Sequence, residues 1–192
     1  DGICADNDSV IIKITGINDE PVADSNKYSL AQNSVLTVSA PGILADDDDI
    51  DNGATIFVGE VNGSAINVGS LITLATGAEL NVSSNGSFTY NPKCLVAGLD
   101  SFTYAVKDEN NALSSTVKVY LQISQNMWFV DDVVTNGSGS FNSPFNSMAS
   151  VESLSQAGDY VFLFPGTYSQ NLTLKNNQKL IGADENWLCT SG

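Results

Sequence analysis

The first candidate for chemistry is the acidic stretch 45-ADDDDIDNG-53, which contains the aspartates Asp46, Asp47, Asp48, Asp49 and Asp51. Carboxylates this close repel one another unless water, salt or a bound cation screens them. Oxygen ligands on a turn suit calcium, a hard cation that accepts about six to eight of them. The stretch does not match an EF-hand, because Asn52 stands at the required glycine position and Val58 at that of the terminal glutamate. A solvated acidic loop is the alternative.

The charge balance excludes some partners and most familiar catalytic arrangements. The 192 residues include 22 acidic and only 7 basic side chains, which gives a net charge of −15. Nucleic acid and anionic lipid need clustered cations, so we expect neither as a partner. The chain has no histidine, so catalysis or metal binding would depend on carboxylates. No apolar run is long enough for a membrane span, so we expect none in this segment.

The cysteines give little sign of a metal site. Cys4, Cys94 and Cys189 lie far apart and form no CxxC pair, which argues against zinc and against a dense disulfide framework. One disulfide with one cysteine left over is an alternative. We expect buried free thiols.

Strand patterns dominate the first two thirds of the chain. Apolar and polar residues alternate between turn residues in 10–16, 35–40, 79–83, 86–90, 101–107 and 116–123. Phe102, Tyr104 and Val106 share one face of their strand, as Val117, Val119, Leu121 and Ile123 share one face of theirs. This pattern predicts an all-β fold, a two-sheet sandwich with a common apolar centre.

The last third has a different pattern. A turn-rich loop over 136–147 precedes 148-MASVESLSQAG-158, in which apolar residues recur at helical spacing. We expect a helix over about 147–157, with Asn146 or Ser147 as its N-cap and Gly158 as its stop. Short strands over 160–164, 171–175 and 179–182, with Asn and Gly at the corners, predict a coil of parallel β-helix.

An internal comparison indicates tandem modules. Residues 1–19 align without gaps on residues 108–126, with the same apolar alternation and few identities, at an offset of 107 residues. Residues 1–18 are therefore expected to be the last strand of a preceding module. Residues 8–17 could also complete a sandwich in a neighbouring chain by strand addition.

Several longer stretches resemble known families. The stretches 18-NDEPVADSNKYSLAQNSVLTVSAPGILADDDDIDNG-53, 86-GSFTYNP-92 and 99-LDSFTYAVKDENN-111 resemble bacterial cadherin-like tandem modules of the VCBS and RTX-adhesin type. The stretches 128-WFVDD-132, 143-SPFNSMASV-151, 158-GDYVFLFPGTY-168 and 171-NLTLKNNQKLIG-182 are similar to the start of pectate-lyase-like right-handed parallel β-helices, where a helix caps the first coil. The resemblances imply a cadherin-like (Ig-like) β-sandwich over 19–126 and an incomplete β-helix segment over 127–192.

The resemblance to cadherin-like modules implies calcium at the linkers between modules. It places 18-NDEP-21, with Asp24 nearby, at such a junction, and the acidic stretch where such modules carry their Asp-rich loop. The turn 108-DEN-110 could face the same junction or the next one. Calcium there would stiffen the chain. The candidate metal ligands are Asp19, Glu20, Asp24, Asp46, Asp47, Asp49, Asp51, Asp108 and Glu109. The second junction, 125-QNMWF-129, lacks this signature, and we expect Met127 and Trp128 to pack the sandwich against the β-helix.

These observations favour an extracellular structural or adhesive module of a large bacterial surface or secreted protein, a calcium-stiffened stalk or filament segment. Its expected partners are calcium, neighbouring modules or copies of the same chain, and surface carbohydrate or another cell-surface protein. We expect no enzymatic activity, because paired aspartates such as Asp131 and Asp132 are too common to indicate a glycosidase. The alternative is an accessory part of a polysaccharide-binding or polysaccharide-degrading β-helix protein.

Overall fold

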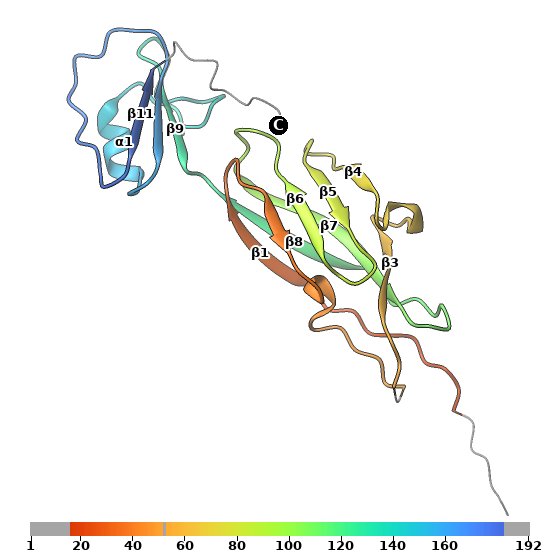
Figure 1. The fold of residues 1–192 in the computed structure, drawn as a ribbon. Coiled ribbons are helices and arrows are strands. Elements are labelled where there is room, and N and C mark those ends of the chain that lie inside the picture. Colours follow the sequence, from red (N-terminus) through yellow and green to blue (C-terminus); the bar gives the residue numbers. More distant parts are fainter. Residues whose placement is uncertain (1–15, 52, 183–192) are drawn as a thin grey trace, which may run out of the picture.

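Two four-stranded sheets pack face to face in the computed structural model, which describes residues 16–51 and 53–182 (Figure 1). The first sheet has the order β1 (Asn26–Ala31), β8 (Val117–Ser124), β7 (Gly98–Lys107) and β3 (Phe57–Val61). The second has the order β2 (Leu36–Val38), β6 (Phe88–Asn91), β5 (Glu79–Val82) and β4 (Leu71–Thr73). The predicted sandwich is therefore confirmed. The predictions missed β1, β3 and β4.

The core lies between these sheets. On β8 the side chains of Val119, Leu121 and Ile123 are buried, whereas the alternate residues point outward. The rings of Tyr28, Phe88 and Phe102 meet edge to face across the sandwich, with centroids 5.1 and 5.7 Å apart. The two faces inferred from the alternation are confirmed.

Strand β1, the first of the sandwich, pairs with β8, the last one. It pairs in parallel with β8, so that Asn26 lies opposite Val119 and Leu30 opposite Ile123. The other strand pairs of this sheet, β8 with β7 and β7 with β3, are antiparallel. This parallel pairing brings the segment before β1 to the same end of the sandwich as the turn after β7.

A close contact between two turns positions the acidic stretch. The short helix η1 (Gly42–Leu44) follows the cis peptide between Ala40 and Pro41. Its Ile43 N–H donates to the carbonyl of Gly86, 3.0 Å away, in the turn between β5 and β6. Gly86 has a φ of +83°, and a Cβ there would stand 1.9 Å from the carbonyl oxygen of Pro41. Glycine is therefore required at this contact.

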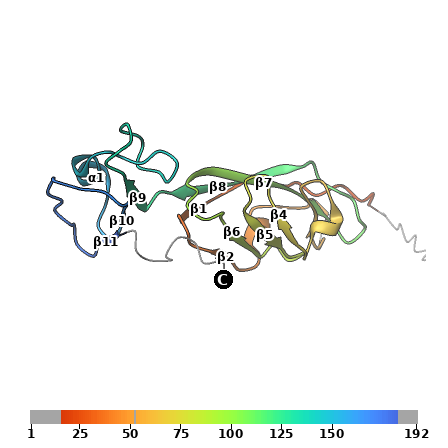
Figure 2. The same ribbon diagram turned by 90° about the horizontal axis from the view of Figure 1, so that it is seen from above.

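A smaller unit follows the sandwich, at the end of the molecule opposite the acidic stretch (Figures 1 and 2). Its parallel sheet has the order β11 (Lys179–Gly182), β10 (Tyr160–Leu163) and β9 (Met127–Val130). One face of the sheet packs on α1 (Met148–Leu154) through Val130, Val161 and Val151. The other face carries a second cluster of Met127, Phe129 and Phe162.

Several expectations for this unit were wrong. Residues 171–175 form no strand, although Leu172 packs on the α1 cluster. The helix is shorter than expected, with Ser147 as its N-cap. Trp128 does not pack between the units: its ring stacks on Phe145, at 5.9 Å and 9°, because residues alternate across β9 and Trp128 takes the α1 face. The β-helix and the capping role of α1 stay predictions.

The expectation for the cysteines was also wrong. Cys94 lies in the turn between β6 and β7, where it is only partly buried, and it forms a disulfide. A sulfur that core side chains do not enclose stays accessible for this bond. Cys4 and Cys189 lie outside the described residues, as do most of the strand expected over 10–16 and most of the segment 8–17. No helix within the described ranges is long and apolar enough to cross a membrane.

Candidate functional site

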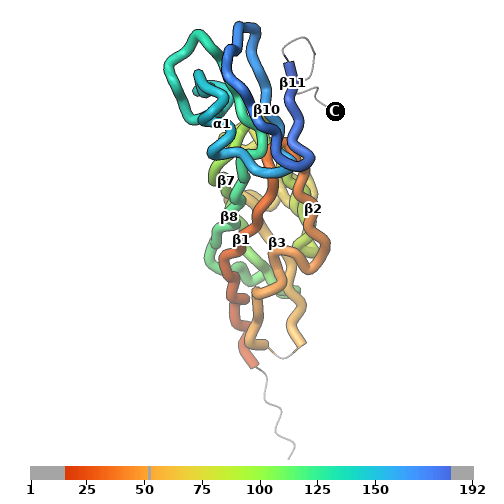
Figure 3. The backbone as a smooth tube through the Cα atoms, turned by 90° about the vertical axis from the view of Figure 1, so that its left-hand side faces the viewer, coloured from red at the N-terminus to blue at the C-terminus, as the bar shows by residue number. Residues whose placement is uncertain are grey.

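The segment before β1 runs antiparallel to the acidic stretch at one end of the sandwich (Figure 3). The backbones of Val22 and Asp48 exchange two hydrogen bonds, of 2.8 and 3.1 Å. One pleat further, the N–H of Asp24 donates to Oδ1 of Asp47 at 2.7 Å. These bonds place Asp24 and Asp47 together although 23 positions separate them in the sequence.

Side chains extend this pairing in both directions. The N–H of Asp19 donates to Oδ2 of Asp51 at 2.8 Å, and Nδ2 of Asn26 donates to Oδ1 of Asp46 at 2.6 Å. Within the loop, the N–H of Asp51 donates to Oδ1 of Asp49 at 2.9 Å. Main-chain and amide donors thus offset part of the repulsion between the carboxylates.

The turn after β7 joins the same end. Nδ2 of Asn18 donates to Oδ2 of Asp108 at 2.6 Å, and the amide of Asn110 donates back to Asn18. Oε2 of Glu109 accepts from the N–H of Thr55 at 2.8 Å, just beyond the acidic stretch. The structure therefore brings together the three acidic segments that the sequence singled out. Glu20 is exposed and makes no hydrogen bond to another described residue.

Asp108 is held as a carboxylate. Only 2% of its surface is exposed, and this burial by itself raises its pKa. The side chain of Asn18 and the N–H groups of Ala112, Asn110 and Asn111 act in the opposite direction, and together they lower the pKa below its usual range. Asp108 therefore fixes the turn in its ionised form.

Tyr104 anchors the acidic stretch to the core. Its hydroxyl, at the end of a fully buried side chain, lies 2.8 Å from the carbonyl oxygens of Asp24 and Ile43 and 3.0 Å from both carboxylate oxygens of Asp47. One hydroxyl proton can satisfy only one of these acceptors at a time. Several oxygens thus converge on one donor. The sequence placed Tyr104 on the inward face of its strand but gave no signal that its hydroxyl reaches this stretch.

The surroundings of Asp47 disfavour its charge. Burial is the main cause that raises its pKa to about 6, and the nearby carboxylates of Asp46 and Asp24 add to this effect. Hydrogen bonds from the Asp24 N–H and the Tyr104 hydroxyl offset part of the rise. A cation here would favour the ionised form.

Two buried oxygens at this end have no hydrogen-bond donor among the described residues. They are Oδ1 of Asn26, whose side chain is nine-tenths buried, and Oδ2 of Asp49. Unpaired buried oxygens are costly, and a cation is one way to satisfy them. Nevertheless, within residues 16–51 and 53–182 no group of three or more acidic or cysteine side chains is already gathered closely enough to hold a metal ion.

The sheet order and the acidic loops define an all-β sandwich module with a cadherin-like fold. The chain belongs to the bacterial cadherin-like domain family, whose family model matches residues 18–125. This membership suggests an adhesion or extracellular structural module. A search of curated proteins finds no significant match.

Solved structures give weaker likenesses. Drosophila N-cadherin EC1-4 aligns at 12% identity and a TM-score of 0.37, over 62% of this chain and 32% of that one. Protocadherin Gamma B7 domains 1-4 align at 8% identity and 0.25, over 63% and 32%. A Photobacterium sp. JT-ISH-224 2,6-sialyltransferase aligns at 10% identity and 0.30, over 74% and 26%. The chain thus spans about a third or less of each structure, and these likenesses carry no functional argument.

Proposed function

We propose that this chain is a calcium-stiffened module of an extracellular bacterial adhesin or surface protein. The observation that carries the proposal is the convergence of segment 18–24, the acidic stretch and the turn at 108–110 on one end of the sandwich. This end leads back to the residues that precede the module, where a neighbouring module would attach.

The chain's own residues fit calcium by their chemistry. Asp47, Asp49 and Asp51 offer carboxylates on a turn, Asn26 offers an unpaired amide oxygen, and Asp19 lies beside Asp51. Calcium would supply positive charge that offsets the repulsion among these groups. Because the described residues hold no ready cluster, further oxygen ligands would come from water or from a neighbouring module. The segment 18–24 would then lose freedom relative to the sandwich, which is the stiffening step.

A thermal melt tests the proposal. Calcium at about 100 times its dissociation constant stabilises a folded protein by about 2.7 kcal/mol, which for a domain of this size raises the Tm by roughly 5–10 °C. We expect this rise in calcium and its reversal by excess EDTA. An unchanged Tm under both conditions would contradict calcium stiffening.

A matched pair of variants locates the effect. The double variant Asp49→Asn with Asp51→Asn removes two charges from the acidic end, and we expect it to lose most of the calcium-dependent rise. Glu60→Gln with Glu79→Gln removes the same charge from β3 and β5, and we expect the full rise to persist. Equal losses in both variants would indicate general screening instead of a site.

For residues 127–182, we propose the start of a right-handed parallel β-helix. The parallel pairing of β9, β10 and β11, one strand after another, supports this proposal. A structure of the chain in a longer parent protein tests it: a further parallel strand on β11 would support the β-helix, and an antiparallel one would contradict it. A β-helix here would support the second candidate function, an accessory part of a polysaccharide-binding or polysaccharide-degrading protein.

We also propose that the chain has no enzymatic activity of its own. In the described structure Asp132 accepts from the N–H of Thr167 at 2.8 Å, and Asp131 accepts from the N–H of Val133 at 3.1 Å. Both aspartates thus have a role in holding turns. Assays of the purified chain against acidic and neutral polysaccharides test this proposal, and turnover abolished by Asp131→Asn or Asp132→Asn would contradict it.

A further inference from the structure

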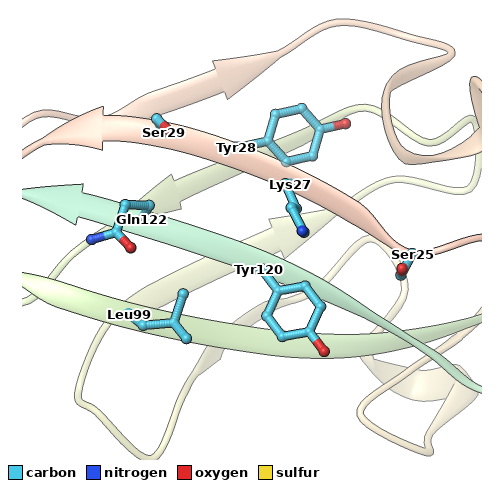
Figure 4. A pocket seen from close by; sticks show the side chains of 7 residues that line it. All are labelled: Ser25, Lys27, Tyr28, Ser29, Leu99, Tyr120 and Gln122. Carbon is cyan, nitrogen blue, oxygen red and sulfur yellow. The ribbon is translucent and has the colours of Figure 1, made fainter.

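A groove lies on the outer face of the first sheet, and at Ser25 it reaches the border of the acidic end. It has a volume of about 550 Å³, and its floor is formed by β1, β8 and β7 (Figure 4). Lys27, Tyr120, Gln122 and Leu99 stand on this face, while Tyr28 lies across the edge of β1 (Figure 4). Leu99 is 65% exposed although it is apolar.

Strand register places the groove residues beside one another. Lys27 on β1 lies directly opposite Tyr120 on β8, and Ser29 lies opposite Gln122. On the other side of β8, Leu99 of β7 lies opposite Gln122. Side chains paired in this way stand about 5 Å apart at Cβ, close enough to contact one small ligand together.

The polar groups of the groove are free to bind a ligand. The Lys27 ammonium, the Tyr120 hydroxyl and the Gln122 amide make no hydrogen bond to any other described residue. Strand β8 is paired on both sides, by β1 and β7, so the centre of the groove presents no unpaired main-chain N–H. A peptide could not add as a strand there. The groove therefore favours a ligand held by side chains.

The charge of this face is opposite to that of the whole chain. Two of the seven basic residues flank Tyr120: Lys27 lies across from it, and Nζ of Lys118 lies 5.9 Å from its ring centroid. Among the described residues, none of those that line the groove is acidic. The carboxylates of Asp46 and Asp47 act on Tyr28, whose pKa is raised by burial first and by these two charges second. In a chain of net charge −15, this local cationic surface selects an anion.

We propose that this groove binds an acidic oligosaccharide. A pyranose ring presents its polarised C–H groups to the face of Tyr120, and Leu99 extends the apolar surface. The sugar carboxylate pairs with the ammonium of Lys27, and the sugar hydroxyls bond to Gln122 and Ser29. This site needs no calcium, so it stands independently of the proposed stiffening. It gives the module a ligand-binding function of its own.

NMR titration with oligogalacturonate of about six sugars tests the proposal, in EDTA so that calcium does not crosslink the ligand. Because the groove is open, we expect a dissociation constant of about 0.1–1 mM. Chemical shift changes should gather on 25–29, 99–101 and 118–122. Maltohexaose, of equal length and neutral, should bind at least about 10-fold more weakly.

Variants distinguish the contribution of the Tyr120 ring to binding from that of the Lys27 charge. We expect Tyr120→Ala and Lys27→Glu each to weaken binding at least about 10-fold, and Tyr120→Phe to change it by no more than about 2-fold. Lys179→Glu is the matched control, because Nζ of Lys179 also lies over a tyrosine ring, that of Tyr160 at 5.3 Å, but outside the groove. Its binding should be unchanged.

Three outcomes overturn the proposal. One is the absence of oligogalacturonate binding at about 10 mM, well above the expected constant. Another is equal binding by Lys27→Glu, Lys179→Glu and the unchanged protein. The third is a shift of the same resonances when the protein concentration alone is raised, if Lys27→Glu abolishes this shift. That result would show that the acidic end of a second copy occupies the groove. None of these results alters the calcium melt, so the two proposals fail separately.

Discussion

The two ends of the sandwich are held by different forces. At the acidic end, carboxylates of the loop accept hydrogen bonds from the main chain of segment 18–24. At the other end, Met127 is buried in the cluster with Phe129 and Phe162, and Leu95 from the sandwich packs against it. Apolar burial is complete without a ligand, whereas clustered charge leaves repulsion that protons or cations relieve. The ends should therefore respond to different perturbations.

The largest expected effect concerns the apolar end. Phe129 is fully buried, and its ring lies 5.4–6.2 Å from those of Phe141, Phe162 and Phe164. We expect Phe129→Ala to lower the free energy of unfolding by about 3–5 kcal/mol, through lost burial and a cavity. Urea unfolding followed by tryptophan fluorescence measures this loss. Phe141→Ala, at a ring 37% exposed, should cost clearly less. Equal losses would contradict the assignment of this cluster as a core.

A smaller effect is expected at the turn that positions the acidic stretch. Gly86→Ala places a methyl group against the carbonyl of Pro41 at a positive φ, so we expect a loss of about 3 kcal/mol and a weaker calcium response. Gly63→Ala is the control, because its φ is +71° but its Cβ would meet open space. That variant should lose only about 1 kcal/mol by backbone strain. If both variants lose the same stability, the contact between the turns is unimportant.

The next effect isolates the hydroxyl of Tyr104. Tyr104→Phe removes the hydroxyl donor that the oxygens of Asp24, Ile43 and Asp47 share, and we expect a loss of about 1–2 kcal/mol. Tyr90→Phe is the matched control. The Tyr90 hydroxyl donates to Oδ2 of Asp100 at a distance of 2.7 Å, and this pair does not belong to the acidic end. Calorimetry with and without calcium distinguishes them: only Tyr104→Phe should change the calcium-dependent rise in Tm.

The smallest effect is the pH dependence from Asp47. Its folded pKa of about 6 lies above the value of about 4 for an unfolded aspartate, so between these values the folded state binds more protons. In EDTA, this group should therefore add stability as the pH falls through 6 toward 4, and remove it as the pH rises. The effect is modest because Asp47 is only half-buried. Denaturation at pH 7 and pH 5 measures this contribution, which should make the free energy of unfolding larger at pH 5. The variant Asp47→Asn should lack this gain.

The sequence predicted much of the sandwich but little of its connections. Regular alternation revealed β5 to β8, because their inward residues are large and apolar. Strand β1 was missed because Asn26, Lys27 and Ser29 obscure its pattern, and its partner β8 lies some 90 positions away. The stretch 171–175 alternates like a strand, yet no neighbouring strand pairs with it in the described structure. Alternation reports which side chains are buried and does not supply a pairing partner.

The candidate acidic site shows the same division. Its three segments and their aspartates could be identified from local composition, since charge density is a property of the sequence itself. Their convergence depends on the parallel pairing of β1 with β8 and on the contact of Ile43 with Gly86. The contact of Asp47 with Tyr104 and the raised pKa that follows from burial therefore appear only in the folded chain.

The sequence by itself determined the sign of the charge, the inward faces of the main strands and the acidic segments, because these depend on residue type and on a period of two. The tertiary structure decided that Tyr104 anchors the acidic stretch, that Cys94 is bonded, and that Lys27, Tyr120 and Leu99 share one groove. Those features depend on strand register and on contacts between distant segments. Local patterns cannot specify either, because the same alternation is compatible with many pairings.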